Sequence, residues 1–304
     1  MALAFVLAVL TGAVRSAVSV LFATLGEVIA ERAGVLNLGV EGCMLVGACG
    51  GFIVGVETDN TLLAIVVGTL LGGVVSLIHA YLTISRGANQ VASGLALLFF
   101  CLGLTALIGA PYVSKNVTGL NPVPVPLLSE LPYLGPILFR HDLLSYAAYL
   151  LCPVVWFVLF RTRWGLIVRA VGEDARVPFA AGWKVRPVQY AAVFIGGLLG
   201  GLGGAHLSLA YTHSWVEGMT NGRGFIAVAL VIFSTWHPIR ALGGALVFGG
   251  AIALQLQLQG LGVPVSPFVL NMAPYILTIV VLLLTSRNRR FSMPQGLRLS
   301  FQGS

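Results

Sequence analysis

Charge is what this sequence has least of. Only 9% of its 304 residues are charged and 58% are hydrophobic, whereas roughly a quarter of the residues of a soluble domain are charged. Seventeen Lys and Arg outnumber ten Asp and Glu, which gives a formal net charge of +7. So few charges cannot cover a water-facing surface. The composition therefore excludes an extracellular enzyme, a nucleic-acid-binding module and a disordered linker.

Catalytic motifs are missing as well. The sequence contains no H-E-x-x-H, no G-x-S-x-G and no C-x-x-C. Neither lysine follows a glycine, so there is no Walker A loop. The segment from Gly222 to Ala227 fits G-x-G-x-x-A, but it opens an apolar run and follows no strand. We expect no enzyme and no bound cofactor or metal, so that any ATP and Mg belong to partner subunits.

Long apolar runs, by contrast, fill the chain. A membrane-spanning helix needs about 20 residues, so a chain of this length holds about eight to ten. We predict an all-α polytopic transmembrane bundle of about nine spans, the seventh short enough to be a half-helix. The predicted spans are 3–25, 35–56, 61–84, 91–110, 142–160, 187–210, 225–236, 242–258 and 267–286.

The basic residues gather on one side of these spans. If the spans alternate in direction, thirteen Lys and Arg fall on one side and three on the other, with Arg15 inside the first span. By the positive-inside rule, the richer side is cytoplasmic, the N-terminus lies outside and the C-terminus inside. The cytoplasmic set is Arg32, Arg86, Arg161, Arg163, Arg169, Arg176, Lys184, Arg186, Arg240, Arg287, Arg289, Arg290 and Arg298; the outer set is Lys115, Arg140 and Arg223.

We predict one transmembrane domain, residues 1–286, and a cytoplasmic tail, residues 287–304. The outer loop 111–141 is rich in proline, which favours a stiff extended cap over a helix. The inner loop 161–186 holds the densest charge in the chain. It fits a basic stop-transfer loop and a docking element for a cytoplasmic partner equally well.

Small residues recur every four positions in two spans, which predicts close helix packing in lipid. The four cysteines lie singly in apolar runs and are typical of packing residues. His79 and His206 are interpreted as hydrogen-bonded packing residues. The glycine stripes are Gly47, Gly51 and Gly55, and Gly196, Gly200 and Gly204 with Gly197 and Gly201 beside them.

Polar residues at membrane depth are the first candidates for function, because burying them in lipid is costly. Glu27 and Glu31 lie one helical turn apart with Arg32 beside them. These three fit a structural ionic cluster at the inner helix ends and a functional group equally well. Asn37 and Glu41 lie deeper, and Gln90 and Ser93 enter the fourth span from the same side; these four are the candidates for a translocation path.

Several stretches resemble the permease subunits of bacterial ABC importers for nucleosides and simple sugars, a family related to branched-chain amino acid permeases. The residues from Leu25 to Gly42 resemble its opening signature, and further matches follow in the same order over nearly the whole chain. They are Asn89–Ala96, Arg169–Asp174 with Ala180–Gly182, Gly222–Ala229 and Met272–Tyr275.

The resemblance implies an inner-membrane, multi-pass permease that works with two ATP-binding subunits, a second homologous permease and an external substrate-binding protein. The second permease is expected to form a heterodimer, with a homodimer as the alternative. The resemblance also implies that the inner loop couples to the ATPase, although Pro178 and Trp183 depart from the family pattern. The coupling residues it marks are Gly172, Glu173, Asp174, Ala180, Ala181 and Gly182.

We therefore predict the membrane subunit of an ATP-driven importer in a bacterial plasma membrane. A nucleoside is the preferred cargo, followed by a simple sugar and a branched-chain amino acid. The alternative from another class is a stand-alone secondary carrier that uses Glu41 as a proton site. Membrane lipid is expected around the chain, and no nucleic acid.

Overall fold

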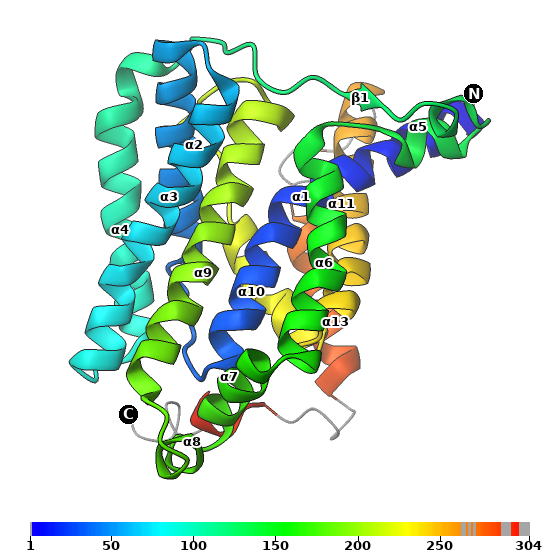
Figure 1. The fold of residues 1–304 in the computed structure, drawn as a ribbon. Coiled ribbons are helices and arrows are strands. Elements are labelled where there is room, and N and C mark those ends of the chain that lie inside the picture. The colour runs from blue at the N-terminus through cyan, green and yellow to red at the C-terminus, as the bar shows by residue number, and fades with distance from the viewer. Residues whose placement is uncertain (1, 263–265, 267–268, 270–271, 287–292, 298–304) are drawn as a thin grey trace.

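The computed structural model describes residues 2–262, 266, 269, 272–286 and 293–297, and helices dominate them (Figure 1). Seven helices are long and apolar enough to cross a membrane. This confirms the predicted all-α polytopic bundle. The helices are α1 (Ala2–Arg32), α2 (Val40–Thr58), α3 (Thr61–Ala80), α4 (Gln90–Gly109), α6 (Leu143–Arg161), α9 (Val185–His206) and α11 (Pro238–Gly260).

Two further apolar helices are shorter. Helix α10 (Arg223–Phe233) has 11 residues, which at about 1.5 Å per residue gives roughly 16 Å, about half of a bilayer core. The predicted seventh span is therefore a half-helix. Helix α13 (Ala273–Ser286) has 14 residues, and part of the predicted ninth span lies outside the described residues. The number of complete crossings stays a prediction.

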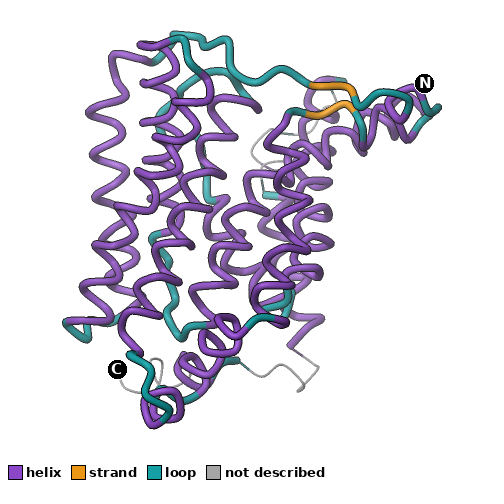
Figure 2. Tube along the Cα trace, viewed as in Figure 1, coloured by secondary structure: helices purple, strands orange, loops and turns teal. Residues whose placement is uncertain are grey.

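Short elements connect the long helices (Figure 2). The π-helical turns η1 (Tyr81–Ser85) and η4 (Leu207–Tyr211) extend α3 and α9. Helices α7 (Arg163–Glu173) and α8 (Arg176–Ala180) lie between α6 and α9. The outer loop contains η2 (Ala110–Tyr112), β1 (Val123–Pro124), η3 (Leu128–Glu130), α5 (Leu134–Leu138) and β2 (Arg140–His141).

The proline-rich outer loop is only partly extended. Its two strands pair antiparallel, with Val123 opposite His141. The one-turn helix α5, which contains Pro136, corrects the expectation that this loop has no helix. Proline is tolerated there because the first turn of a helix leaves its N–H groups unpaired in any case.

The bundle has two faces, which we call upper and lower as drawn in Figure 1. The β1–β2 hairpin and α5 lie at the upper face, and α7 and α8 lie at the lower face. Arg32 and Arg161 end helices at the lower face, and Arg240 lies in the first turn of α11 there. The predicted cytoplasmic residues Arg287, Arg289, Arg290 and Arg298 lie outside the described residues.

Helix α1 is the central helix. From Ala17 to Ala30, no side chain is more than 5% exposed. Helices α9, α10, α11 and α6 surround it (Figure 1). The outer helices turn leucines outward, for example Leu107 at 76% and Leu150 at 69% exposure, as expected of surfaces that face lipid. A helix enclosed on all sides keeps its polar side chains away from lipid, where burying them would be costly.

Glycines allow α2, α3 and α9 to touch along their backbones, as the stripes of α2 and α9 predict, and Gly68 and Gly72 of α3 add to the contact. A Cβ atom added at Gly201 would lie 2.6 Å from the carbonyl oxygen of Gly68 and 2.9 Å from the Cα of Gly72. A Cβ atom added at Gly47 would likewise collide with the backbone of Gly201. Close packing of this kind holds helices together where lipid offers no hydrophobic driving force.

Substitution of Gly201 by Ala is therefore expected to lower stability by roughly 1–3 kcal/mol, because the new methyl group has no room. Thermal unfolding of the purified protein in detergent measures the effect. Gly103→Ala is the matched control, because no atom lies within 4 Å of a Cβ added there. Equal unfolding temperatures for the two variants would contradict the packing.

Candidate functional site

The segment between α1 and α2, residues 33–39, is held by polar side chains. The backbone N–H of Asn37 donates to Glu27 Oε2 at 3.4 Å, and the Asn37 Oδ1 accepts the N–H of Gly39 at 3.0 Å. Gln90, at the start of α4, accepts the N–H of Leu36 at 2.9 Å. These bonds give buried backbone groups the partners that a lipid environment cannot supply.

His79 completes this network from α3. Its Nε2 lies 3.0 Å from the carbonyl oxygen of Leu36, and its Nδ1 lies 3.1 Å from the Oγ of Ser93. The side chain is fully buried, which confirms its interpretation as a hydrogen-bonded packing residue. Asn37, Gln90 and Ser93 thus meet in one hydrogen-bond network. Their part in a translocation path stays a prediction.

Glu41, the fourth path candidate, caps the half-helix α10. Its carboxylate accepts the Thr220 hydroxyl at 2.6 Å, the Gly222 N–H at 2.7 Å and the Gly224 N–H. The side chain is only 4% exposed. A carboxylate at a helix N-terminus pairs the unbonded N–H groups and the positive end of the helix dipole. Glu41 therefore fixes where α10 begins.

Two glycines make that cap possible. Gly222 has φ +76°, a left-handed conformation that glycine adopts without strain. A Cβ at Gly224 would lie 2.6 Å from the Cα of Glu41. The Gly-x-Gly spacing thus lets α10 approach α2 at backbone distance.

Glu27, Glu31 and Arg32 form no ion pair with one another among the described residues. Glu31 Oε2 accepts the indole N–H of Trp236 at 2.6 Å, and Arg32 donates through Nε and Nη2 to the carbonyl oxygen of Trp236 at 3.2 Å. Both carboxylates are at most 1% exposed. Glu31 and Arg32 therefore join the lower end of α1 to the segment after α10, whereas Glu27 bonds the 33–39 segment. The role of the three as a structural ionic cluster stays a prediction.

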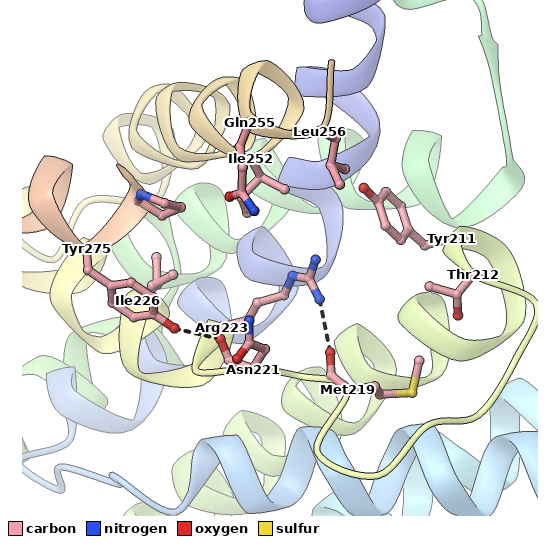
Figure 3. A pocket seen from close by; sticks show the side chains of 11 residues that line it. Tyr211, Thr212, Met219, Asn221, Arg223, Ile226, Ile252, Gln255, Leu256 and Tyr275 are labelled. Atoms are coloured by element: carbon pink, nitrogen blue, oxygen red, sulfur yellow. Dashed lines mark hydrogen bonds between the residues drawn. The ribbon is translucent and has the colours of Figure 1, made fainter. Parts of the chain in front are cut away.

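The N-termini of α10 and α13 open onto a cavity of about 280 Å³, which we call the Arg223 cavity (Figure 3). The Tyr275 hydroxyl, near the start of α13, donates to the carbonyl oxygen of Asn221 at 2.8 Å. No Asp or Glu is among the lining residues. These are Tyr211, Thr212, Met219, Asn221, Arg223, Ile226, Ile252, Gln255, Leu256, Pro274 and Tyr275.

The structure corrects the position that the sequence predicts for Arg223. Its position between apolar runs placed it among three outer-loop charges, but the structure places it at the first turn of α10, inside the bundle. Its Nη1 donates to the carbonyl oxygen of Met219 at 3.2 Å. The sequence carries a signal for this position, because the stretch Gly222–Ala229, which resembles the permease family, begins where α10 begins.

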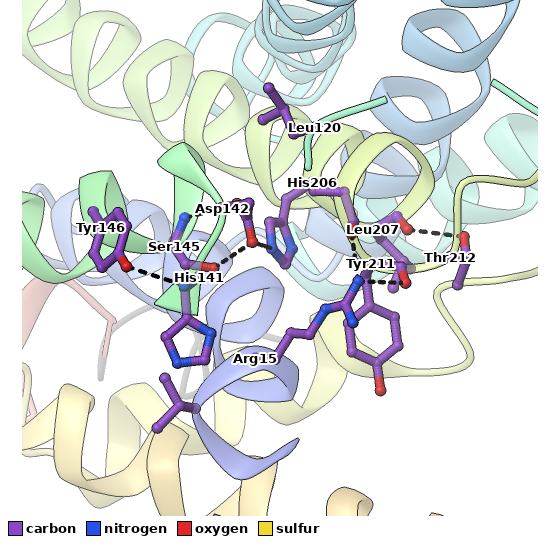
Figure 4. A network of polar contacts seen from close by, with 12 residues as sticks. Arg15, Leu120, His141, Asp142, Ser145, Tyr146, His206, Leu207, Tyr211 and Thr212 are labelled. Atoms are coloured by element: carbon purple, nitrogen blue, oxygen red, sulfur yellow. Dashed lines mark hydrogen bonds and ion pairs between the residues drawn. The ribbon is translucent and has the colours of Figure 1, made fainter. Parts of the chain in front are cut away.

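A partly buried arginine positions Tyr211 at the wall of this cavity (Figure 4). Arg15 Nη2 donates to the carbonyl oxygens of Ala210 at 2.8 Å and Tyr211 at 3.2 Å. The end of a helix leaves such carbonyls unpaired, so a cation there is stabilising. Ser16 also bonds the Tyr211 hydroxyl at 3.0 Å. Arg15, which the sequence placed inside the first span, thus holds the end of η4.

Asp142 and His206 link the outer loop to the same helix end. Asp142 caps α6 by accepting the Ser145 N–H at 3.0 Å and hydroxyl at 2.7 Å. Its Oδ2 also lies 3.6 Å from His206 Nε2, and both side chains are buried. His206 is buried, as expected of a packing residue, but neither ring nitrogen has a hydrogen-bond partner among the described residues, which corrects the interpretation as a hydrogen-bonded histidine. The pair anchors the β1–β2 hairpin above η4.

The coupling residues lie together at the lower face, but in two helices. Gly172 and Glu173 end α7, Asp174 follows it, and Ala180 ends the five-residue α8. Pro178 lies in the first turn of α8, where proline is tolerated, and Gly182, with φ +84°, closes the helix two residues after Ala180. Hydrogen bonds from Arg176 to Asp174 lower the pKa of that carboxyl. Burial and then the charges of Arg240 and Arg32 lower the pKa of His237 nearby.

A second cavity, of about 410 Å³, lies beside this segment and is called the lower cavity. Gly172 packs against the backbone of Arg32 and Gly34, and Gly296 reaches Gly172 from the C-terminal segment 293–297. Leu297 is fully buried. The lining residues are Gly34, Gln90, Val171, Glu173, Asp174, Ala175, Arg176, Gln189, Gln295 and Gly296.

Among the described residues, no cluster of three or more His, Cys, Asp or Glu could hold a metal ion. Every cysteine is buried and unpaired. Hydrogen-bond donors, amides and aromatic rings make up the chemistry of the Arg223 cavity. Such a lining can bind a neutral polar solute weakly.

Comparisons with known proteins agree with this architecture. A family model described as "Branched-chain amino acid transport system / permease component" matches residues 8–285. The Haloferax volcanii protein named "Putative glucose ABC transporter permease protein TsgC13" is 42% identical and covers 98% of both chains. The guanosine ABC transporter permease protein NupQ of Bacillus subtilis is 37% identical over 88% of both. The nucleoside ABC transporter permease protein NupC of Lactococcus lactis is 34% identical over 87% of both. No solved structure matches the chain.

Glu41→Gln is expected to lower the free energy of unfolding by about 1.5–3 kcal/mol, because hydrogen bonds to a charged acceptor are lost. Thr220→Val removes one of the three donors and is expected to cost about 1 kcal/mol. Both are measured by thermal unfolding in detergent. If Glu41→Gln unfolds like the unaltered protein, the carboxylate does not hold α10.

Proposed function

Since the chain belongs to the family of branched-chain amino acid transport system permease components, we propose that it imports a nucleoside as the membrane subunit of an ATP-driven ABC importer. The observation that carries the cargo is the Arg223 cavity, which has tyrosines, an amide and a guanidinium but no lining carboxylate. Aromatic faces with a few polar groups are typical of sites for planar, polar ligands. Relatives named for guanosine and nucleosides support the same cargo.

The charge around the cavity suits an uncharged solute. Arg223 contributes one positive charge, and Glu41, behind the first turn of α10, contributes one negative charge. A cationic cargo would find no carboxylate on the lining. An uncharged nucleoside gains hydrogen bonds there and leaves no charge unpaired.

In the proposed assembly, two ATP-binding subunits meet the lower face, a second permease subunit completes the pathway, and an external binding protein delivers cargo to the upper face. The basic residues at the lower helix ends support a cytoplasmic lower face and an external N-terminus. Helix α8 and its C-terminal flank support the docking role, because Val177 is 62%, Phe179 73% and Trp183 50% exposed.

A sugar is the second candidate cargo, favoured by the 42% identical relative named for glucose. A stand-alone carrier with Glu41 as proton site is disfavoured by geometry. Three donors already bond that carboxylate, so a proton there would displace the cap of α10.

Uptake by proteoliposomes that contain the whole transporter tests the proposal. We expect ATP-dependent accumulation of tritiated guanosine and uridine, and none with a non-hydrolysable ATP analogue. Glucose uptake without nucleoside uptake would show that the cargo is a sugar and not a nucleoside. Nucleoside uptake driven by a pH gradient without ATP would support the carrier.

Phe179→Ala and Trp183→Ala are expected to weaken binding of the ATP-binding subunits by about 2 kcal/mol each, because exposed aromatic side chains often dominate interfaces. Co-purification with the ATP-binding subunits measures the loss. Leu107→Ala is the matched control, since Leu107 is 76% exposed on α4, away from α8. Equal retention of the subunits by all variants would contradict docking at α8.

A further inference from the structure

The Arg223 side chain is only partly satisfied by the protein. Its guanidinium stands in the middle of the cavity, between the sides formed by Tyr211 and Tyr275 (Figure 3). Nη1 donates to the carbonyl oxygen of Met219 at 3.2 Å. Nε is buried and has no hydrogen-bond partner among the described residues. A buried donor without a partner is rare and calls for one from outside the protein.

The face of the Tyr211 ring lies against this guanidinium. The centre of the Tyr211 ring lies 5.7 Å from the Arg223 Cζ, and Arg15 lies over the same ring at 5.4 Å. The ring of Tyr275 lies on the other side of the cavity, fixed by its bond to the backbone of Asn221. A planar ring that enters here meets π faces and, at its edge, the nitrogen donors of Arg223.

We propose that Arg223 reads the edge of the nucleobase and selects nucleosides that carry two neighbouring acceptors, as the O6 and N7 atoms of an oxopurine do. This inference rests on the proposed nucleoside import. Nη1 is occupied by Met219, so Nε and Nη2 form the available edge, and an arginine edge pairs two adjacent acceptors in a bidentate manner. Adenine offers an acceptor at N7 but an amino group next to it, which faces the arginine donor to donor.

The volume agrees with one nucleoside. At about 280 Å³ the cavity is near the lower end of ligand pockets, which start at roughly 300 Å³. Asn221 brings an amide to the same cavity, and this side chain can both donate and accept. It complements the arginine, which only donates.

Binding to the purified complex of permease and ATP-binding subunits, without the external binding protein, tests the assignment. Leaving that protein out removes its own selectivity from the measurement. Tritiated guanosine is bound in a scintillation proximity assay, and unlabelled guanosine, inosine, adenosine and glucose compete. We expect guanosine and inosine to compete at least about tenfold better than adenosine, a difference of about 1.4 kcal/mol.

Arg223→Gln and Arg223→Lys are expected to abolish that preference, because neither keeps the two-donor edge. A merely structural role would weaken guanosine and adenosine equally and leave their ratio unchanged, and this result overturns the proposal. Arg140→Gln, which removes an exposed positive charge from β2, is the matched control and is expected to keep the ratio. The ratio is independent of how much of each variant folds.

Three outcomes distinguish a failure of the Arg223 assignment from a failure of the proposed nucleoside import. A complex that transports nucleosides with ATP but shows no preference for oxopurines contradicts the role of Arg223 and leaves the function intact. A complex that transports nucleosides but binds none at millimolar concentration contradicts the cavity assignment. A whole transporter that imports no nucleoside contradicts the proposed function itself.

Discussion

A helix that begins inside a membrane needs partners for its first N–H groups, and Glu41 supplies them. In the bilayer core no water can bond these groups, and each one left unpaired costs several kcal/mol. The carboxylate of Glu41 joins Thr220, Gly222 and Gly224 at one point. Glu41 thereby fixes the start of α10, whose first residue, Arg223, lines the Arg223 cavity.

Helix α10 also connects the two ends of the candidate site. At its upper end, Arg223 lines the cavity, and after its lower end Trp236 bonds Glu31 and Arg32 of α1. The coupling segment lies nearby, where the backbone of Gly172 packs against that of Arg32 and Gly34. A displacement of α7 and α8 by an ATP-binding partner would therefore reach α1 and α10 through direct contacts. The described residues thus form a continuous physical link from the lower face to the cavity.

Much of the fold could be predicted from the sequence, because lipid imposes simple rules. Apolar runs mark the long helices, glycine stripes mark the contacting faces of α2 and α9, and the shortness of the seventh run marks α10. The site was harder to predict. Asn37 and Gln90 bond the 33–39 segment directly, and Ser93 does so through His79, a structural role that residue type and position in the sequence do not reveal. Arg223 was counted as a loop charge because hydropathy cannot distinguish a loop that returns to half depth from one that stays outside.

Import as proposed requires the nucleoside to pass through the Arg223 cavity from the upper face, which is proposed to be external. A cysteine placed at Asn221 tests it most directly, because the four native cysteines are buried. In proteoliposomes with the whole transporter, a membrane-impermeant thiol reagent added outside is expected to label Asn221→Cys in the absence of nucleotide, and labelling should fall when ATP drives the cycle. Labelling only from the ATP side, or labelling from outside that is indifferent to ATP, would contradict the account.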